Sequence, residues 1–144
     1  MLSNTSIQKY LDSGDITISP WEEDMMDAAR ITLHLGENIL IPQGDVVVDV
    51  RNNVLPQYQE AHIDSEAPFA LKSNMFILGE TFEDIGLSER VGMLIDGRST
   101  LARLGISIAQ TAMIIDTGQQ PKKMTFEIRN GGPHTVLLYP KMKF

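Results

Sequence analysis

Hydrophobic positions along this chain recur mostly at alternate residues in short runs, and only the beginning shows helical spacing. Residues 3–13 are expected to form a short helix, with Ser3 as its N-cap, Ile7 on its apolar face and Gly14 as its stop. Beyond it, short β-rich runs alternate with turn signals. Strands are predicted at 16–19, 30–35, 39–41, 45–50, 74–79, 91–95, 107–111, 113–115, 124–129 and 135–139, with breaks at 36–38, 42–44, 79–80, 118–121 and 130–133.

Many short strands joined by regular turns indicate a mainly β fold, either a sandwich, a jelly roll or a small barrel. Residues 51–68 are polar and weakly periodic, which is typical of a long surface connection. The 144 residues correspond to one domain, residues 1–144, large enough to bury one core.

Composition excludes several classes of protein. The chain has no cysteine, so neither a disulfide scaffold nor a thiolate zinc site is expected. It has neither a signal-peptide pattern nor an apolar run of about 18 residues, so no membrane contact and a cytoplasmic location are predicted. The net charge of −7 disfavours binding to polymeric nucleic acid. A small phosphorylated ligand remains compatible with a local cluster of basic side chains.

The three histidines, His34, His62 and His134, are far apart and show no ligand spacing. We therefore predict no metal site, and each histidine is interpreted as a surface or strand-edge polar residue.

The segment 96–105, which follows the predicted strand 91–95, carries the clearest candidate chemistry. Ser99 is expected to cap a single helical turn. With Thr100, Arg98 and Arg103 it places hydroxyls and guanidinium groups where they can hold a polyphosphate. The alternative is an ordinary capped turn with solvated arginines.

Two acidic residues follow. Asp116 ends an apolar strand before a glycine turn, and it is either a turn-forming residue or a functional one. Glu127 lies in the strand 124–129, whose alternation places Phe126 inside and Glu127 on the opposite face with Thr125 and Arg129. The alternative for Glu127 is a solvent-facing carboxyl paired with a neighbour.

Together these segments resemble the deoxycytidine triphosphate (dCTP) deaminase family, within the trimeric dUTPase superfamily. Residues 97–105 are similar to its G-R-S-S-L-[AG]-R-L-G signature, and the similarity is strongest over 75–142. The further matching segments are Leu33-His34-Leu35-Gly36 for L-R-L-G, Thr111-Ala112 with Ile115-Asp116 and Gly118 for T-A…I-D-P-G, Thr125-Phe126-Glu127 for [TV]-L-E, and 137–142 for L-Y-P-G-M.

The resemblance implies a β-clip fold: a dUTPase-like distorted barrel of short antiparallel strands, with an N-terminal helix and a short helix after the signature. It also implies homotrimers with sites between subunits. The substrate would be a deoxypyrimidine nucleotide. The implied chemistry is metal-free water attack that converts dCTP to dUTP, with Mg²⁺ carried only on the triphosphate and no zinc.

The resemblance also assigns roles to residues. Glu127 would be the general base, Arg103 would lie beside the ring, and Arg98, Ser99 and Thr100 would bind phosphates. The substrate-binding set would include Thr111 and Ala112, with the Ala112 backbone against the base. Asp116 would lie near the deoxyribose; in dUTPase relatives the acid at this position activates water for phosphate hydrolysis.

Some residues depart from the family pattern. Residues 116–121 occupy the place of the family's D-P-G-[WF]-x-G but lack its aromatic residue. Ala109 stands where family members often have a histidine. Family members usually continue beyond the position of Phe144 with a segment that closes over the triphosphate, and we expect that segment to be absent here.

Three hypotheses remain at this level. The first is dCTP deamination. The second is a dUTPase, which forms dUMP and diphosphate, or a bifunctional enzyme. The third is a non-catalytic trimer that binds nucleotides or has a regulatory role.

Overall fold

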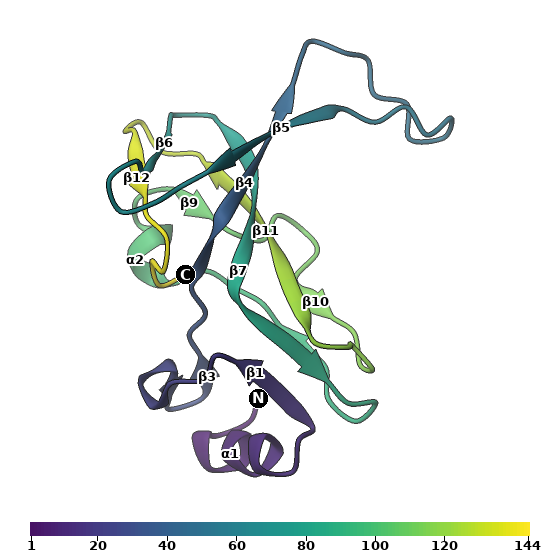
Figure 1. Cartoon of the computed structure of the whole chain (residues 1–144), viewed down its shortest axis with the longest axis vertical. Helices are drawn as coiled ribbons and strands as arrows, with labels where there is room; N and C mark the ends of the chain where they lie inside the picture. The colour runs from purple at the N-terminus through teal and green to yellow at the C-terminus, as the bar shows by residue number, and fades with distance from the viewer.

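The computed structural model describes residues Met1 to Phe144 and consists mainly of antiparallel strands (Figure 1). The longest helix has nine residues, and none is long and apolar enough to cross a membrane. The elements in chain order are α1 (Asn4–Asp12), β1 (Ile16–Ser19), the 3₁₀ turn η1 (Glu23–Met25), β2 (Met26–Asp27), β3 (Arg30–Ile31), β4 (Leu35–Gln43), β5 (Gln57–His62), β6 (Phe69–Leu71), β7 (Phe76–Leu87), β8 (Met93–Leu94), α2 (Ser99–Ala102), β9 (Ile106–Ser107), β10 (Ile114–Ile115), β11 (Lys122–Asn130) and β12 (Val136–Leu138).

The central sheet has the strand order β5-β4-β7-β11-β9, and β1 pairs with the far end of β7. The predicted N-terminal helix is confirmed, since the Ser3 side chain accepts a hydrogen bond from the backbone of Ser6 and Gly14 ends it at a φ of 74°. The predicted mainly β fold is confirmed as well.

The prediction of a break at 79–80 is wrong, because β7 runs straight through this position. A Cβ atom at Gly79 would lie 2.8 Å from the Ile128 side chain and 3.0 Å from that of Leu35. The glycine is needed here for close packing between strands, and the sequence cannot distinguish that need from a turn.

Residues 36–38 are likewise part of a strand. A Cβ at Gly36 would lie 2.8 Å from Cγ of Glu80, so this glycine also permits a close approach, and the register of β4 on β7 shifts between Leu35 and Ile39. The predicted strand 30–35 is divided, because residues 32–34 lie between β3 and β4.

The predictions for residues 45–50 and 51–68 are also wrong. Residues 45–50 form no strand, although they are rich in valine, whereas β5 lies inside the predicted surface connection. β5 pairs with β4 from Asn38↔His62 to Gln43↔Gln57. Its side chains are mostly exposed on both faces because it is an edge strand, so its sequence has no hydrophobic alternation. We call residues 44–56, which connect β4 and β5, the arm; it projects from the body (Figure 1).

The core lies between the sheet and the segments around it, and the end of the chain helps to close it. Phe126 and Ile128 on β11 are buried, and Phe144 packs edge-to-face on Phe126 at 5.3 Å. The backbone N–H of Phe144 donates to the Leu33 carbonyl at 3.0 Å. The last residues are therefore fixed beside the start of β4.

An ion pair fastens the α1–β1 corner to the end of β7. Arg90 donates two hydrogen bonds to Asp15, the shorter at 2.5 Å, and the Ser13 hydroxyl donates a third at 2.7 Å. The Arg90 hydrogen bond, followed by that from Ser13, lowers the pKa of Asp15 from 3.8 to about 2.

This lowered pKa predicts a pH-dependent contribution to stability. Because the folded state favours ionised Asp15, its contribution should be complete above about pH 4 and should disappear as the pH falls through about 2. Asp15→Asn should therefore lower the free energy of unfolding at neutral pH. The free energies of the variant and the wild type should become equal as the pH approaches about 2. Urea unfolding across this range measures the difference. Arg90→Gln should remove the same step, and a pH-independent difference would contradict the assignment.

Candidate active site

The signature segment forms a short turn whose buried residue anchors it to the core. Leu101 is buried, Arg98 is half-buried, and Ser99, Thr100 and Arg103 are exposed. The prediction that Ser99 caps the turn is wrong: Arg98 is the N-cap residue, Ser99 is the first helical residue, and no side chain caps the helix. The Ser99 hydroxyl is therefore not used by the fold.

Both predicted arginines lack an ion-pair partner within the chain. Arg98 and Arg103 form no salt bridge and no side-chain hydrogen bond. Arg98 is close enough to Asp27 to help lower the pKa of that carboxyl, but the main causes there are hydrogen bonds from the Ala28 backbone and from Arg30. Two unpaired guanidinium groups next to free hydroxyls can bind an anion such as a phosphate.

Glycines attach the signature turn to the end of β11. Gly105 has a φ of 85°, which confirms the predicted stop, and a Cβ there would lie 2.5 Å from the backbone nitrogen of Gly132. The N–H of Gly131 donates to the Gly105 carbonyl at 2.8 Å. β9 then pairs with β11 through Arg129↔Ser107. The signature is thus fixed beside the strand that carries Glu127.

Glu127 lies on the face of β11 that the alternation predicts, half-buried between exposed Thr125 and Arg129. Its backbone N–H donates to the Ile108 carbonyl at 2.8 Å, and its Oε2 accepts a hydrogen bond from the Gln110 N–H at 2.9 Å. Oε1 has no partner in the chain. One carboxyl oxygen is therefore held in place while the other is free to contact a water molecule.

Gln110 is a residue that the sequence reasoning missed. Its side-chain amide donates to the Ser107 hydroxyl at 2.7 Å and to the Glu127 carbonyl at 3.1 Å. These bonds hold the segment before Thr111 against β11. The available signal was its position directly before the Thr-Ala pair of the family pattern.

Thr111 and Ala112 are exposed and begin a second small element. β10 pairs with β8 through Ile115↔Met93, and exposed Asp116 follows it. The structure thus brings the segment before Thr111 to Glu127. It shows no hydrogen bond or ion pair that joins Asp116 to Glu127 or to the signature arginines. The two predicted acids are on separate elements.

The chain contains no ready metal site, because nowhere do three or more histidine, aspartate or glutamate side chains gather into a group that could hold an ion. Two cavities, of about 220 and about 350 Å³, are lined by none of the predicted site residues. Most of the predicted site residues are exposed on a single chain, and Arg98 and Glu127 are half-buried.

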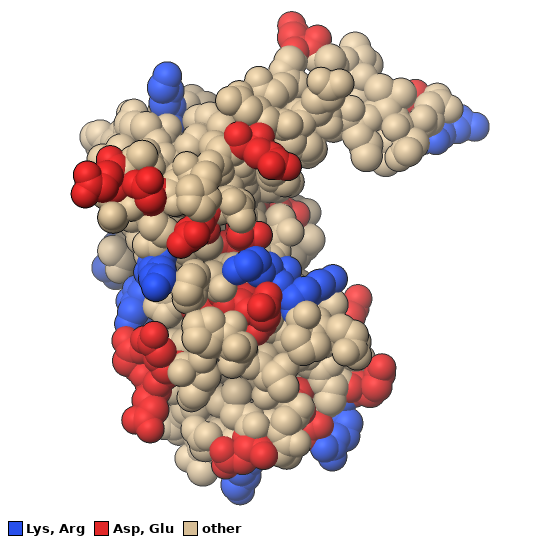
Figure 2. All heavy atoms as spheres, viewed as in Figure 1, with Lys and Arg blue, Asp and Glu red and all other residues tan.

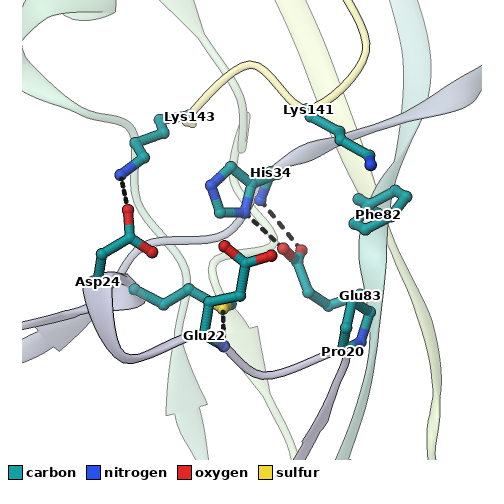
Figure 3. Close-up of a pocket in the computed structure, with 9 residues that line it drawn as sticks. Pro20, Glu22, Asp24, His34, Phe82, Glu83, Lys141 and Lys143 are labelled. Atoms are coloured by element: carbon teal, nitrogen blue, oxygen red, sulfur yellow. Dashed lines mark hydrogen bonds and ion pairs between the residues drawn. The ribbon is translucent and has the colours of Figure 1, made fainter.

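The smaller cavity reveals a buried pair that the sequence did not predict (Figure 3). The Glu83 carboxyl, 1% exposed, accepts hydrogen bonds from His34 Nδ1 at 2.5 Å and from the His34 N–H at 3.0 Å. Lys143 pairs with Asp24 at 2.7 Å at the rim. His34 directly precedes β4 and bridges to Lys143, as a strand-edge polar residue would, but its pairing with a buried acid was not predicted. The one signal was that His34 stands where the family pattern has arginine.

Comparisons with known proteins identify the family of this chain. The family model described as dCTP deaminase-like matches residues 1–144. Three relatives carry the name "dCTP deaminase, dUMP-forming". The protein of Sulfurihydrogenibium sp. is 30% identical over 144 residues, which cover 99% of this chain and 79% of the relative. That of Methanosphaera stadtmanae is 32% identical over 145 residues (97% and 73%), and that of Dictyoglomus thermophilum is 32% identical over 148 residues (99% and 76%).

A solved structure, the 2'-deoxycytidine 5'-triphosphate deaminase from Agrobacterium tumefaciens, has the same fold. It superposes with a TM-score of 0.72 at 16% sequence identity, over 99% of this chain and 45% of that chain. The chain thus spans less than half of that protein. Together with the match over residues 1–144 and the curated relatives, this shows that the chain belongs to the dCTP deaminase-like family of enzymes that act on nucleotides.

Proposed function

We propose that this protein converts dCTP to dUMP in two hydrolytic steps. In the first, water replaces the amino group of the cytosine ring, which gives dUTP and ammonia. In the second, water cleaves the triphosphate, which gives dUMP and diphosphate. The names of the relatives support the overall conversion, so the bifunctional alternative is favoured over deamination that stops at dUTP.

Glu127 carries this proposal. A general base must be within hydrogen-bond reach of the water that it activates and must be held in position. The Gln110 N–H fixes Oε2, and Oε1 is free. Half-burial between strands partly removes the carboxyl from solvent. In this arrangement Oε1 takes a proton from the attacking water, and the same carboxyl then delivers a proton to the departing amino group.

The exposed polar groups of the signature would bind the nucleotide. Arg98, Ser99 and Thr100 would contact the phosphates, and the unpaired Arg103 would lie near the ring, where charge develops. As the family resemblance implies, we place Mg²⁺ on the triphosphate as part of the substrate. Thr111 and the Ala112 backbone would contact the base.

The open surface presented by these residues supports assembly. A site for a nucleotide normally buries most of its ligand, whereas Ser99, Thr100 and Arg103 are exposed on one chain. This exposure is consistent with the homotrimer that the family resemblance implies, and we propose that the sites lie between its subunits. The partner is a deoxypyrimidine nucleotide and not a nucleic acid polymer, because the chain carries a net charge of −7.

Product analysis tests the function directly. The purified protein is incubated with dCTP and, separately, with dUTP in the presence of Mg²⁺, and nucleotides are separated by ion-exchange chromatography. We expect ammonia, diphosphate and dUMP from dCTP. Accumulation of dUTP alone would limit the protein to deamination. The absence of product from both substrates at high protein concentration would overturn the proposal in favour of a non-catalytic binder.

A substitution at Asp116 should separate the two steps. Its side chain is exposed and forms no hydrogen bond within the chain, which leaves it available to a phosphate-directed water. Asp116→Asn should lower diphosphate release from dUTP by about 10²-fold or more while ammonia release from dCTP continues. The measurement is the ratio of dUTP to dUMP formed from dCTP. Asp12→Asn, which changes an exposed acid on α1 away from the candidate site, should leave that ratio unchanged. Normal dUMP formation by Asp116→Asn would assign the second step to another group.

A further inference from the structure

The arm exposes an unusual amount of apolar surface. Six of the fourteen large hydrophobic side chains that are exposed on the chain lie in it, and Val47 is the most exposed of these six at 88%. The six are Val46, Val47, Val48, Val50, Val54 and Leu55. A cluster of exposed apolar side chains in one short segment is typical of an interaction site.

The arm is nevertheless an ordered element. Asp49 and Val54 exchange two backbone hydrogen bonds at 2.8 and 3.0 Å, and the Asp49 carboxyl accepts bonds from Asn52. All hydrogen bonds made by residues 44–56 stay within the arm. It therefore has its own local structure but no partner in the body of the same chain.

A second exposed apolar surface lies elsewhere on the chain. Ile114 on β10 and Leu94 on β8 are directly paired across the strands, and they are 73% and 65% exposed. Their neighbours Ile115 and Met93 are partly buried against the core, so only this face of the two strands lacks a partner.

The two surfaces cannot cover one another within one chain. β10 lies far below the arm in Figure 1. The space-filling view shows that the arm overhangs a hollow on the side of the molecule where β10 is drawn (Figures 1 and 2). Another protein molecule could therefore enter this hollow and contact the arm.

We propose that the arm of one copy packs on the Leu94–Ile114 face of a second copy. The chain itself carries both halves of this contact, which is why a second copy is the occupant. The contact joins two different surfaces, so it repeats from subunit to subunit and closes into a ring when the rotation allows it. It would also place the neighbour's arm beside Thr111, Ala112 and Asp116, where the candidate site is open. The inference rests on the proposed assembly and not on the proposed chemistry.

Cross-linking tests the contact, because the natural chain has no cysteine. Val47→Cys and Ile114→Cys are purified separately, one of them with an affinity tag, and treated with a short bismaleimide alone and as a mixture. We expect cross-linked dimers containing one copy of each variant in the mixture and little product from either variant alone. Cross-linking of Val47→Cys with itself would show arm-to-arm contact, and no product in the mixture would show no contact; both overturn the inference.

Mass measurements provide a second readout. In sedimentation velocity we expect the wild type above the monomer mass of 16.0 kDa and both Val47→Asp and Ile114→Asp as folded monomers. Mixing these two variants should restore a dimer and nothing larger, because one arm and one acceptor face remain intact. Val47→Leu should assemble like the wild type.

A monomeric wild type, or a Val47→Asp variant that assembles like the wild type, would overturn the inference. Ammonia release, assayed separately, distinguishes failure of the contact from failure of the proposed chemistry.

Discussion

Glu127→Gln should lower the turnover of dCTP to ammonia by about 10²- to 10⁴-fold while dCTP still binds. Glutamine has nearly the same shape and keeps an oxygen that can accept the hydrogen bond from the Gln110 N–H. It cannot take a proton from water at neutral pH. The substitution therefore removes the acid–base step and preserves the geometry, which predicts a loss in kcat and little change in dCTP affinity.

Ammonia release under saturating dCTP measures the first quantity, and equilibrium binding of dCTP measures the second. Glu60→Gln removes an exposed carboxyl on β5 and should behave like the wild type. Diphosphate release from dUTP should persist in Glu127→Gln, which is the reverse of the result expected for Asp116→Asn. Wild-type ammonia release by Glu127→Gln would assign the base to another residue.

The local pattern predicts β11 and the direction of Glu127 well because one face of that strand is buried. A period of two in Met124, Phe126 and Ile128 fixes which side chains point inward, and every second residue then points outward. The family resemblance adds the role of Glu127. The end of the signature turn is predictable for a different reason, because glycine readily adopts the positive φ that Gly105 has there.

These local patterns fail to predict strands and turns where tertiary contacts determine the local structure. Gly36 and Gly79 are indistinguishable from turn glycines in the sequence, but they allow neighbouring strands to approach closely. β5 is polar on both faces because only its backbone takes part in the sheet. Conversely, Val46 to Val48 have high strand propensity but no strand beside them, so propensity alone predicts a strand that does not form.

The pairing of His34 with Glu83 is beyond local sequence reasoning because 49 residues separate the two. Loss of this pair should cause the largest change in stability that we expect. Glu83→Ala should lower the free energy of unfolding by about 3 kcal/mol, since removing one partner of a buried polar pair leaves the other unsatisfied. The His34 N–H and Nδ1 would both lose their acceptor, and the truncated side chain would enlarge the neighbouring cavity.

Thermal and urea unfolding at a fixed protein concentration measure this loss, because assembly would otherwise change the apparent stability. For a chain of this size the expected decrease in Tm is about 6–12 °C. Glu83→Gln keeps one acceptor oxygen and most of the volume, so it should cost only about 1 kcal/mol. Asp84→Ala, at the exposed next position of β7, should stay within about 0.5 kcal/mol of the wild type. If Glu83→Ala proved as stable as Asp84→Ala, water in the cavity would have replaced the carboxyl as the partner of His34. The pair would then contribute little to holding the start of β4 against β7.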